Sequence, residues 1–600
     1  MIAYEVLAGA HPFGARTAQG LVAAHLTEAP PPLGARRSDV PPALAALIAQ
    51  LLAKEPAERP QSAELVVEAL DAISASPVPA PSRPRGNVRV MTVAVAVVLL
   101  IVASVSWYAV TQRTAVTGPP TIRTVAVLPF VNTGGNPADD YFSDGMTDEL
   151  AHALARLPGL RIAGRTSSYA FKGKSVSTQE IGRVLDVGAL VEGTVRRAGD
   201  RLRVTTQLVS TTDGKVLWDS VYESQSSDVF GVQDQFTRAV VAALAPALGN
   251  RSADGPVVDV GRGTTDLEAY QLYLKGRYYW LARGEENVAR SIDYFKQAIA
   301  RDPKFARAHA GLAMAYNVLT VYVPDPMDSM PALTLASAVR AVTLDSTLAD
   351  AQVAAALTQE RGGRLHFSDA MSHFRKAIAI EPSNAYAHHS FGFFLLGLGH
   401  TDEAVRELAL ATQLDPLAKS AGTALALARV FARQIPEAIA ESRRVLAVDS
   451  TFALAFQVLG LAQVINGQPD SAVRSLERAK ELSPRMPGRI ARLLFAYAAA
   501  GRWADAERIR AELHRSDGTG SGNIDVAFAD LILGDREPLV RLLTTEVGQR
   551  RWHEQYLFGC NPLLDPLWSD TRFQAAMRKL TVERCQLARP WPISPRPRRE

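Results

Sequence analysis

The C-terminal half of the chain repeats itself with a step of 34 residues. One alanine keeps this step at Ala370, Ala404, Ala438, Ala472 and Ala506. A second small apolar position keeps it at Ala377, Ala411, Val445 and Ala479. Acidic or polar residues close successive units at Glu381, Asp415, Asp449 and Ser483, and proline follows three of them as Pro382, Pro416 and Pro484. A chain with this period buries its apolar faces by stacking one unit on the next.

Paired helices with small residues at fixed positions, and proline after the second helix, resemble the tetratricopeptide repeat. The resemblance implies an α-solenoid of six to seven units over residues 266–515. The unit that ends at Asp345 carries about nine extra residues near residues 321–328, because the unit before it ends 43 residues earlier, at Asp302. We expect a degenerate helical cap at residues 516–585 and a basic, proline-rich tail at residues 586–600. Such a solenoid offers a concave groove to a protein or peptide partner.

A stretch of 21 residues, Val90 to Val110, contains no charge. As a helix it would be roughly 31 Å long, close to the thickness of the hydrocarbon core of a bilayer. The flanking arginines are uneven, with Arg83, Arg85 and Arg89 before the stretch and Arg113 after it. We therefore expect a transmembrane helix at residues 90–110, preceded by a Pro-rich linker at residues 74–89. The location would be a single-pass cell (inner) membrane protein, with residues 1–89 cytoplasmic and residues 111–600 extracytoplasmic or periplasmic.

Two motifs within the first 73 residues point to a family. The run from Tyr4 to Phe13, YEVLAGAHPF, resembles the central helix and following loop in the C-lobe of bacterial serine/threonine kinases. The run from Leu52 to Pro60, LAKEPAERP, resembles the closing signature of that lobe. The resemblance implies a truncated protein-kinase C-lobe at residues 1–73, and the chain as a whole is similar to the C-terminal part of a bacterial receptor-type serine/threonine protein kinase.

The residues with which a kinase transfers phosphate precede this helix in the family. They are absent from the chain, and so is the glutamate that pairs with the counterpart of Arg59. The chain as given is therefore not a competent kinase. It is either the late part of a longer serine/threonine kinase or a true truncation with a vestigial kinase remnant. The first reading is favoured because Met1 falls in the middle of a helix.

Residues 122–247 alternate between strand and helix patterns. The apolar run Val125–Phe130 predicts a buried strand, and Asp144–Leu157 predicts a helix with one apolar face. An antiparallel meander is predicted at Ala189–Val195, Leu202–Val209 and Lys215–Tyr222. A helix over Asp228–Leu248 closes what we expect to be a small α/β sandwich.

Local motifs of this segment occur in the order seen in a TolB amino-terminal-like domain of bacterial sensory and cyclase-associated proteins. They are VAVLPF at 125–130, YFSDGMT at 141–147, GRTSS at 164–168, FKG at 171–173, EGTVRR at 192–197 and LWD at 217–219. The resemblance implies a TolB-like domain at residues 122–247. The family implies no reaction, and so no catalytic residues.

Five acidic residues gather near the predicted helix: Asp139, Asp140, Asp144, Asp148 and Glu149. They suggest a calcium site, but Phe142 occupies a position where the calcium loop needs an oxygen ligand. We favour a role at the helix N-terminus, where acids satisfy free N–H groups and the helix dipole.

Two further segments contain residue types that are common in anion-binding sites. Arg165 with Thr166, Ser167 and Ser168 could bind an anion, although surface hydrogen bonding is the favoured interpretation. Gly134-Gly135 predicts a turn, because no Lys-Ser/Thr follows to make a phosphate loop.

The histidines and cysteines give no metal site. His388 and His389 are adjacent and face different sides of a helix, and His366 with His373 lacks a third ligand. Tyr278, Tyr279 and Trp280 are interpreted as packing residues of the first helix pair, although an exposed subset could anchor a ligand. Two cysteines, Cys560 and Cys585, exclude a disulfide scaffold and a zinc ribbon. Unpaired buried thiols are favoured over a bridge.

The sequence thus predicts a multidomain, mainly α protein: partial kinase C-lobe helices, one transmembrane helix, a small α/β domain and a tetratricopeptide α-solenoid. Its net charge of +4 and lack of a basic block argue against nucleic-acid binding. The expected function is the membrane-anchored sensory and protein-binding region of a bacterial serine/threonine kinase. The alternative is a membrane-tethered tetratricopeptide scaffold.

The chain as given is assigned no catalytic, cofactor-binding or metal-binding residue. ATP and Mg²⁺ belong to the expectation only if the missing kinase part is present. The expected partners are a protein or peptide in the repeat groove and the lipid bilayer, and a homodimer is left open.

Overall fold

The computed structural model describes most of the chain beyond residue 121 and parts of the segment before it. The described residues are 2–8, 13, 30–33, 37, 40–53, 60, 62–75, 122–157, 159–225, 228–244, 263–319, 330–361, 367–483, 489–515, 522–549 and 560–579. The chain divides into two compact units, Met1–Val116 and Thr117–Glu600.

The first unit contains the helices α1 (Ile2–Ala8), α4 (Pro42–Leu51) and α5 (Ala63–Ala75). Pro42 begins α4, a position at which the missing N–H costs no helical hydrogen bond. Tyr4, Leu33 and Ile48 form a small buried cluster, and the Tyr4 hydroxyl donates to the Pro31 carbonyl at 2.9 Å. The segment is helical at α1 and α4, as its patterns predict. Its assignment to a kinase C-lobe stays a prediction.

The prediction of a membrane location is wrong. Among the residues that the structure describes, no helix has both the length and the apolar character needed to cross a bilayer. The longest described helix, α12 (Glu285–Arg301), has 17 residues, so it extends only about 26 Å, and it carries charges at both ends. The expected span at residues 90–110 lies outside the described residues, as does most of the linker at residues 74–89.

The second unit opens with a mixed sheet whose strands lie in the order β3-β1-β4-β5-β6, with β2 paired to β4. The strands are β1 (Thr124–Val127), β2 (Val131–Asn132), β3 (Arg161–Ile162), β4 (Ala189–Ala198), β5 (Arg201–Ser210) and β6 (Val216–Gln225). β1 is parallel to β3 and β4, and β2 is parallel to β4. The chain then runs antiparallel through β4, β5 and β6. The predicted meander is confirmed, with each strand a few residues longer than expected.

Helices cover this sheet unequally. The helices of this part are α7 (Asp140–Ala155), α8 (Arg165–Tyr169), α9 (Thr178–Leu185) and α10 (Val229–Leu244), with a short 3-10 helix η2 (Pro137–Asp139) before α7. Alternate residues of β4 and β5, such as Val191 and Val204, share one core with α7 and α10. On the other face, Leu190 packs with Ile181 and Leu185 of α9. The expected α/β domain is therefore present.

The rest of the unit is an array of helix pairs. The pairs are α11 (Leu267–Ala282) and α12, α13 (Ala306–Leu319) and α14 (Met330–Leu344), α15 (Ala349–Arg361) and α16 (Phe367–Ile380), α17 (Ala385–Leu398) and α18 (Thr401–Leu414), α19 (Lys419–Phe431) and α20 (Ile435–Val448), α21 (Ala453–Ile465) and α22 (Pro469–Leu482), and α23 (Arg489–Ala499) and α24 (Trp503–Arg515). After them come α25 (Gly522–Ile532), α26 (Glu537–Gln549), the 3-10 helix η4 (Pro562–Ser569) and α27 (Thr571–Lys579). The expected helical repeat array is confirmed.

The 34-residue step has a clear physical cause. Ala370, Ala404, Ala438, Ala472 and Ala506 all lie in second helices and are fully buried. Glycine in a first helix allows equally close packing, since a Cβ at Gly460 would lie 2.4 Å from the Leu476 side chain. The turn within each of the last four pairs contains a residue with positive φ at the same step, namely Gly399, Arg433, Gly467 and Gly501. Arg433 alone in that series is not glycine.

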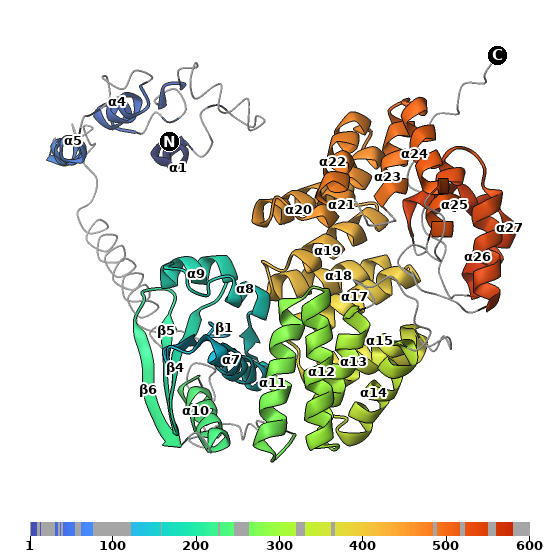
Figure 1. Cartoon of the computed structure of the whole chain (residues 1–600). Helices are drawn as coiled ribbons and strands as arrows, with labels where there is room; N and C mark the ends of the chain where they lie inside the picture. Colours follow the sequence, from blue (N-terminus) through green and yellow to red (C-terminus); the bar gives the residue numbers. More distant parts are fainter. Residues whose placement is uncertain are drawn as a thin grey trace, which may run out of the picture. The chain divides into compact units, whose positions relative to one another are not determined.

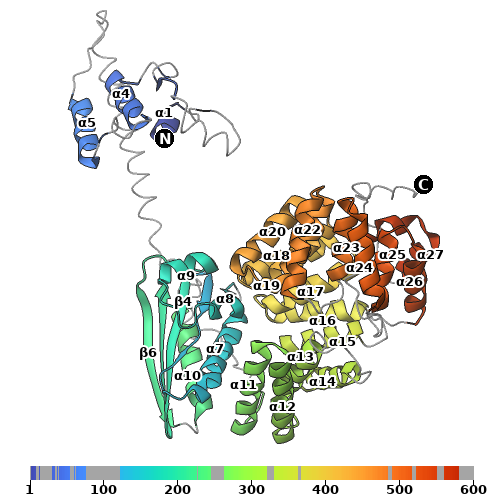
Figure 2. The same cartoon turned by 45° about the horizontal axis from the view of Figure 1, so that its top comes forward.

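The sheet domain and the start of the array share a single hydrophobic core. Figures 1 and 2 show α7 and α10 lying between the sheet and α11. The core joins Met146 of α7 and Phe236 of α10 to Tyr270 and Tyr273 of α11. A side chain at Gly145 would collide with Leu274, at 2.8 Å. The two parts are therefore packed as closely as the interior of one domain.

Candidate functional site

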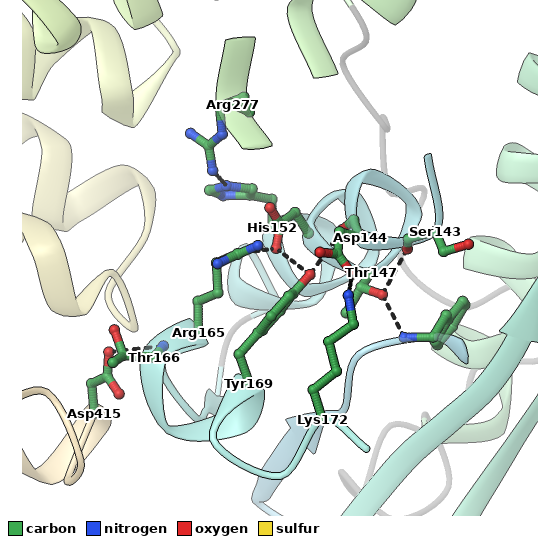
Figure 3. A network of polar contacts seen from close by, with 12 residues as sticks. Ser143, Asp144, Thr147, His152, Arg165, Thr166, Tyr169, Lys172, Arg277 and Asp415 are labelled. Atoms are coloured by element: carbon green, nitrogen blue, oxygen red, sulfur yellow. Dashed lines mark hydrogen bonds and ion pairs between the residues drawn. The ribbon is translucent and has the colours of Figure 1, made fainter. Parts of the chain in front are cut away.

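Polar residues concentrate where α7 and α8 of the sheet domain meet the array, as Figure 3 shows. We call this region the junction. It comprises Asp144, Asp148, Glu149 and His152 of α7, the segment Gly164–Lys172, and Arg277, Arg307, Asp350, Glu381 and Asp415 of the array. Several residues that the sequence singled out as site candidates lie in this region.

The first turn of α8 binds a carboxylate of the array. The backbone N–H groups of Thr166 and Ser167 donate to Asp415 at 3.2 and 2.7 Å, and the Ser167 hydroxyl donates to it at 2.5 Å. The Gly164 N–H also donates to the Leu414 carbonyl. Burial raises the pKa of Asp415, although the hydrogen bonds from Ser167 and Thr166 oppose this rise. The segment of residues 165–168 therefore binds an anion, and this anion is the Asp415 carboxylate of the same chain. The favoured interpretation of surface hydrogen bonding is wrong, because Ser167 and Ser168 are buried.

The acids of α7 are paired with cations. Lys172 lies 2.6 Å from Asp144, Arg165 lies 2.7 Å from Asp148, and Arg307 of α13 lies 2.7 Å from Glu149. All three carboxylates are buried. Burial raises the pKa of Asp144, and its hydrogen bond to Lys172 opposes that rise.

The remaining two acids of the cluster lie at the start of the helix. Asp139 occupies the N-cap position of α7 without a capping side-chain hydrogen bond, and Asp140 accepts from Asn132 at 2.8 Å. The N-terminal role is therefore wrong for Asp144, Asp148 and Glu149, which bind neighbouring cations instead. Among the described residues no group of three or more acids, histidines or cysteines is arranged to hold a metal ion.

Tyr169 and His152 complete the junction. The Tyr169 hydroxyl donates to the Asp144 carbonyl at 3.1 Å, and the guanidinium of Arg165 lies 3.5 Å from the centre of its ring. His152 lies between Glu381, at 3.5 Å, and Arg277, at 3.1 Å. Burial disfavours its charged form, but Glu381 outweighs this effect and raises the pKa of His152. Arg277 also binds Asp350 at 2.9 Å.

The other candidate residues have structural partners. His388 is held by Glu407 at 2.6 Å and by the Pro382 carbonyl at 3.0 Å. His389 packs between Tyr386 and Phe393, and burial next to Arg283 lowers its pKa to about 4. His373 contacts Gln352 at 2.7 Å, and His366 lies outside the described residues.

The aromatic triplet packs as expected. Trp280 is buried and lies edge-on to Tyr386, and Tyr279 stacks on Tyr294. Tyr278 lies edge-on to Tyr279. Gly134-Gly135 forms the predicted bend, in which the Gly134 N–H donates to Asn132 at 3.0 Å.

The cysteine prediction needs correction. Cys560 is buried and disulfide-bonded rather than a free thiol. The other cysteine of the chain, Cys585, lies outside the described residues.

The first helices of the array carry little exposed surface. Residues 351–358 of α15, 421–428 of α19 and 457–464 of α21 are each buried without a break. Exposure is found at the first turns instead, at Ser420 of α19 and Leu454 of α21. These two residues keep the 34-residue step, and the half-buried Tyr386 precedes them in the same register.

No protein-family model matches the chain. A protein described as putative adenylate cyclase 3, from Rhizobium meliloti, is 35% identical over 195 residues, which are 32% of this chain and 33% of that protein. The serine/threonine-protein kinase pkn3 of Myxococcus xanthus is 40% identical over 87 residues, which are 14% of this chain and 16% of the kinase. The chain spans about a third or less of these two curated relatives.

Among solved structures, PilW, a type IV pilus biogenesis factor, is 20% identical with a TM-score of 0.31, and the match covers 36% of this chain and 96% of PilW. Over a short part of its sequence the chain is thus similar to a serine/threonine-protein kinase, and its own helix pairs form the repeat array. The comparisons give no support to the TolB-like assignment or to the transmembrane helix.

Proposed function

We propose that the second unit is a scaffold for a protein or peptide partner, with the repeat array as the binding element. Stacked helix pairs present side chains at a fixed step along a line, which suits an elongated partner. The observation that carries the proposal is the row formed by Tyr386, Ser420 and Leu454. It places the exposed Ser420 and Leu454, and the half-buried Tyr386, at the same repeat position of three successive first helices.

Leu454 is the residue of this row that most favours a binding role. Its side chain is 41% exposed, although it begins a helix whose later residues are buried. An exposed leucine alone is ordinary on a protein surface. Its alignment with Tyr386 and Ser420 in the repeat is what favours a binding edge.

A peptide-display selection on the full chain, followed by fluorescence polarisation with the selected peptides, tests this proposal. Leu454→Glu should weaken binding at least about tenfold, a cost of about 1.4 kcal/mol. Val339→Glu is the matched control, because Val339 is a similarly exposed aliphatic residue on the second helix α14. Equal loss of binding in both variants, or no loss in either, would contradict the proposed edge.

We further propose that this scaffold regulates a serine/threonine kinase encoded with it. Support comes from the partial similarity to kinase pkn3 and from the two C-lobe motifs. Reading the DNA upstream of the first codon tests this part. An open frame with a Gly-rich loop and a catalytic aspartate is expected, and an immediate stop codon would favour a scaffold without a kinase.

A further inference from the structure

β6 is the last strand of the sheet, and only β5 pairs with it among the described strands. Its ten residues run antiparallel to β5 from Val216 to Gln225. In Figures 1 and 2 the strand lies on the side of the domain away from the array. One row of its backbone N–H and C=O groups therefore has no ladder partner among the described strands.

The strand has only part of the usual protection of a sheet edge. Natural edges are shortened, or interrupted by proline, or marked by inward-pointing charges and lysine. β6 is long and contains neither proline nor lysine, although Asp219 and Glu223 are charged and its ladder to β5 has one register shift, between Leu208 and Val209. On its outer face Leu217 and Val221 are 45% and 46% exposed, while Trp218 and Tyr222 pack toward the core.

We propose that β6 pairs with β6 of a second copy of this chain, antiparallel, to give one continuous sheet across a two-fold axis. A two-fold interface brings identical surfaces together, so the strand must be complementary to itself. Side-chain charge decides whether this is so, because like charges directly opposite each other destabilise a strand pair.

One register satisfies this condition over nine of the ten residues, 216–224. With Ser220 opposite Ser220 of the second copy, Asp219 faces Val221, Glu223 faces Leu217, and Trp218 faces Tyr222. Moving the axis by one residue puts Asp219 opposite itself or opposite Glu223. Moving it by two residues removes the clash but shortens the paired segment from nine residues to seven or to five, depending on the direction. Charge and length together therefore select the register centred on Ser220.

Cysteine cross-linking of the full chain tests this register. In a strand pair, opposite Cα atoms lie about 4.5–5.5 Å apart, within reach of a disulfide. Ser220→Cys should therefore give a covalent dimer on mild oxidation. Ser224→Cys is the matched control, because both serines are half-buried on the same face of β6. In the proposed register the two copies of residue 224 lie about 27 Å apart, and this variant should stay uncross-linked.

Sedimentation equilibrium supplies an independent measurement without cysteine chemistry. The chain should form a reversible dimer, and Val221→Asp, which places a carboxylate opposite Asp219 of the second copy, should weaken it at least about tenfold. Val131→Asp, which adds the same charge at an exposed valine of β2, should leave the dimer intact. The proposal would be overturned if the chain stayed monomeric at about 100 µM, a concentration well above a micromolar Kd. Equal cross-linking of the two cysteine variants, or a dimer that survives Val221→Asp, would overturn it as well.

Discussion

Gly164→Ala should separate the sheet domain from the array at α8. A Cβ at this position would lie 2.3 Å from the Asp415 Cβ and 2.5 Å from its Cγ. Carbon atoms in ordinary contact are about 3.5–4.0 Å apart, so the two segments must move apart by about 1.2 Å or more. The Ser167 N–H now donates to Asp415 at 2.7 Å, and a shift of that size would break the bond.

The expected cost has two parts. Overpacking of a tight contact costs about 1–3 kcal/mol, and a lost hydrogen bond to a charged group costs about 1.5–3 kcal/mol. If the segment relaxes so that the two costs overlap, the total is still about 2 kcal/mol, equivalent to a roughly 30-fold change in the opening equilibrium.

Hydrogen exchange measures this opening directly. The amides of Thr166 and Ser167 should exchange at least about 30-fold faster in Gly164→Ala than in the wild type. Gly188→Ala is the control in the same domain, because the nearest atom to its added Cβ is 3.7 Å away. The reasoning fails if Gly164→Ala exchanges like the wild type, or if the control exchanges as fast as Gly164→Ala.

Three further changes probe the rest of the unit. Arg307→Met leaves the buried Glu149 without its cation and should cost about 3–5 kcal/mol in denaturant unfolding, whereas Arg290→Met breaks an exposed pair with Glu286 and should leave the unfolding midpoint close to that of the wild type. Arg433→Gly removes the 2.6 Å ion pair with Asp565, so we expect faster protease cleavage within residues 560–569, while Arg429→Gly at a neighbouring helical position should leave that cleavage rate unchanged. Burial raises the pKa of Asp565 to about 6, against the opposing effect of Arg433. The contribution of Asp565 to stability is therefore complete below the pKa of about 3.9 that an aspartate has in the unfolded chain, and it is lost as the pH rises through about 6. Asp565→Asn should remove this decline in melting temperature between pH 4 and 6, and an unchanged pH profile would contradict it.

The elements that sequence predicted best are those whose signal is local and periodic. The helix pairs follow from small residues such as Ala404 and Ala438, which recur because two helices must approach closely there. The meander follows from alternation in β4 and β5, where every second residue faces the core.

The junction could not be predicted in this way, because its partners lie far apart in the sequence. Asp415 and Ser167 are 248 residues apart, and nothing in either motif indicates the other. One local signal was available. Asp345 and Asp449 each have a threonine two residues later, Thr347 and Thr451, which binds the carboxylate within its own turn. Asp415 is followed at that position by Leu417, so its carboxylate remains available to α8.

This difference between units explains how a repeating surface accepts the sheet domain in only one place. The packing between helix pairs recurs at each unit, so it does not by itself oppose a shift of the domain along the array by one repeat. The charges would not tolerate it. After such a shift α8 would meet Asp449, whose oxygens already bind Thr451 and Lys419. Glu149 would meet Asp350, which occupies the position equivalent to Arg307, five residues after the unit-closing aspartate. A buried carboxylate facing another would cost far more than the shift could recover. The junction therefore fixes the position of the sheet domain on the array, which is the condition for β6 and the Leu454 edge to keep a constant geometry relative to each other.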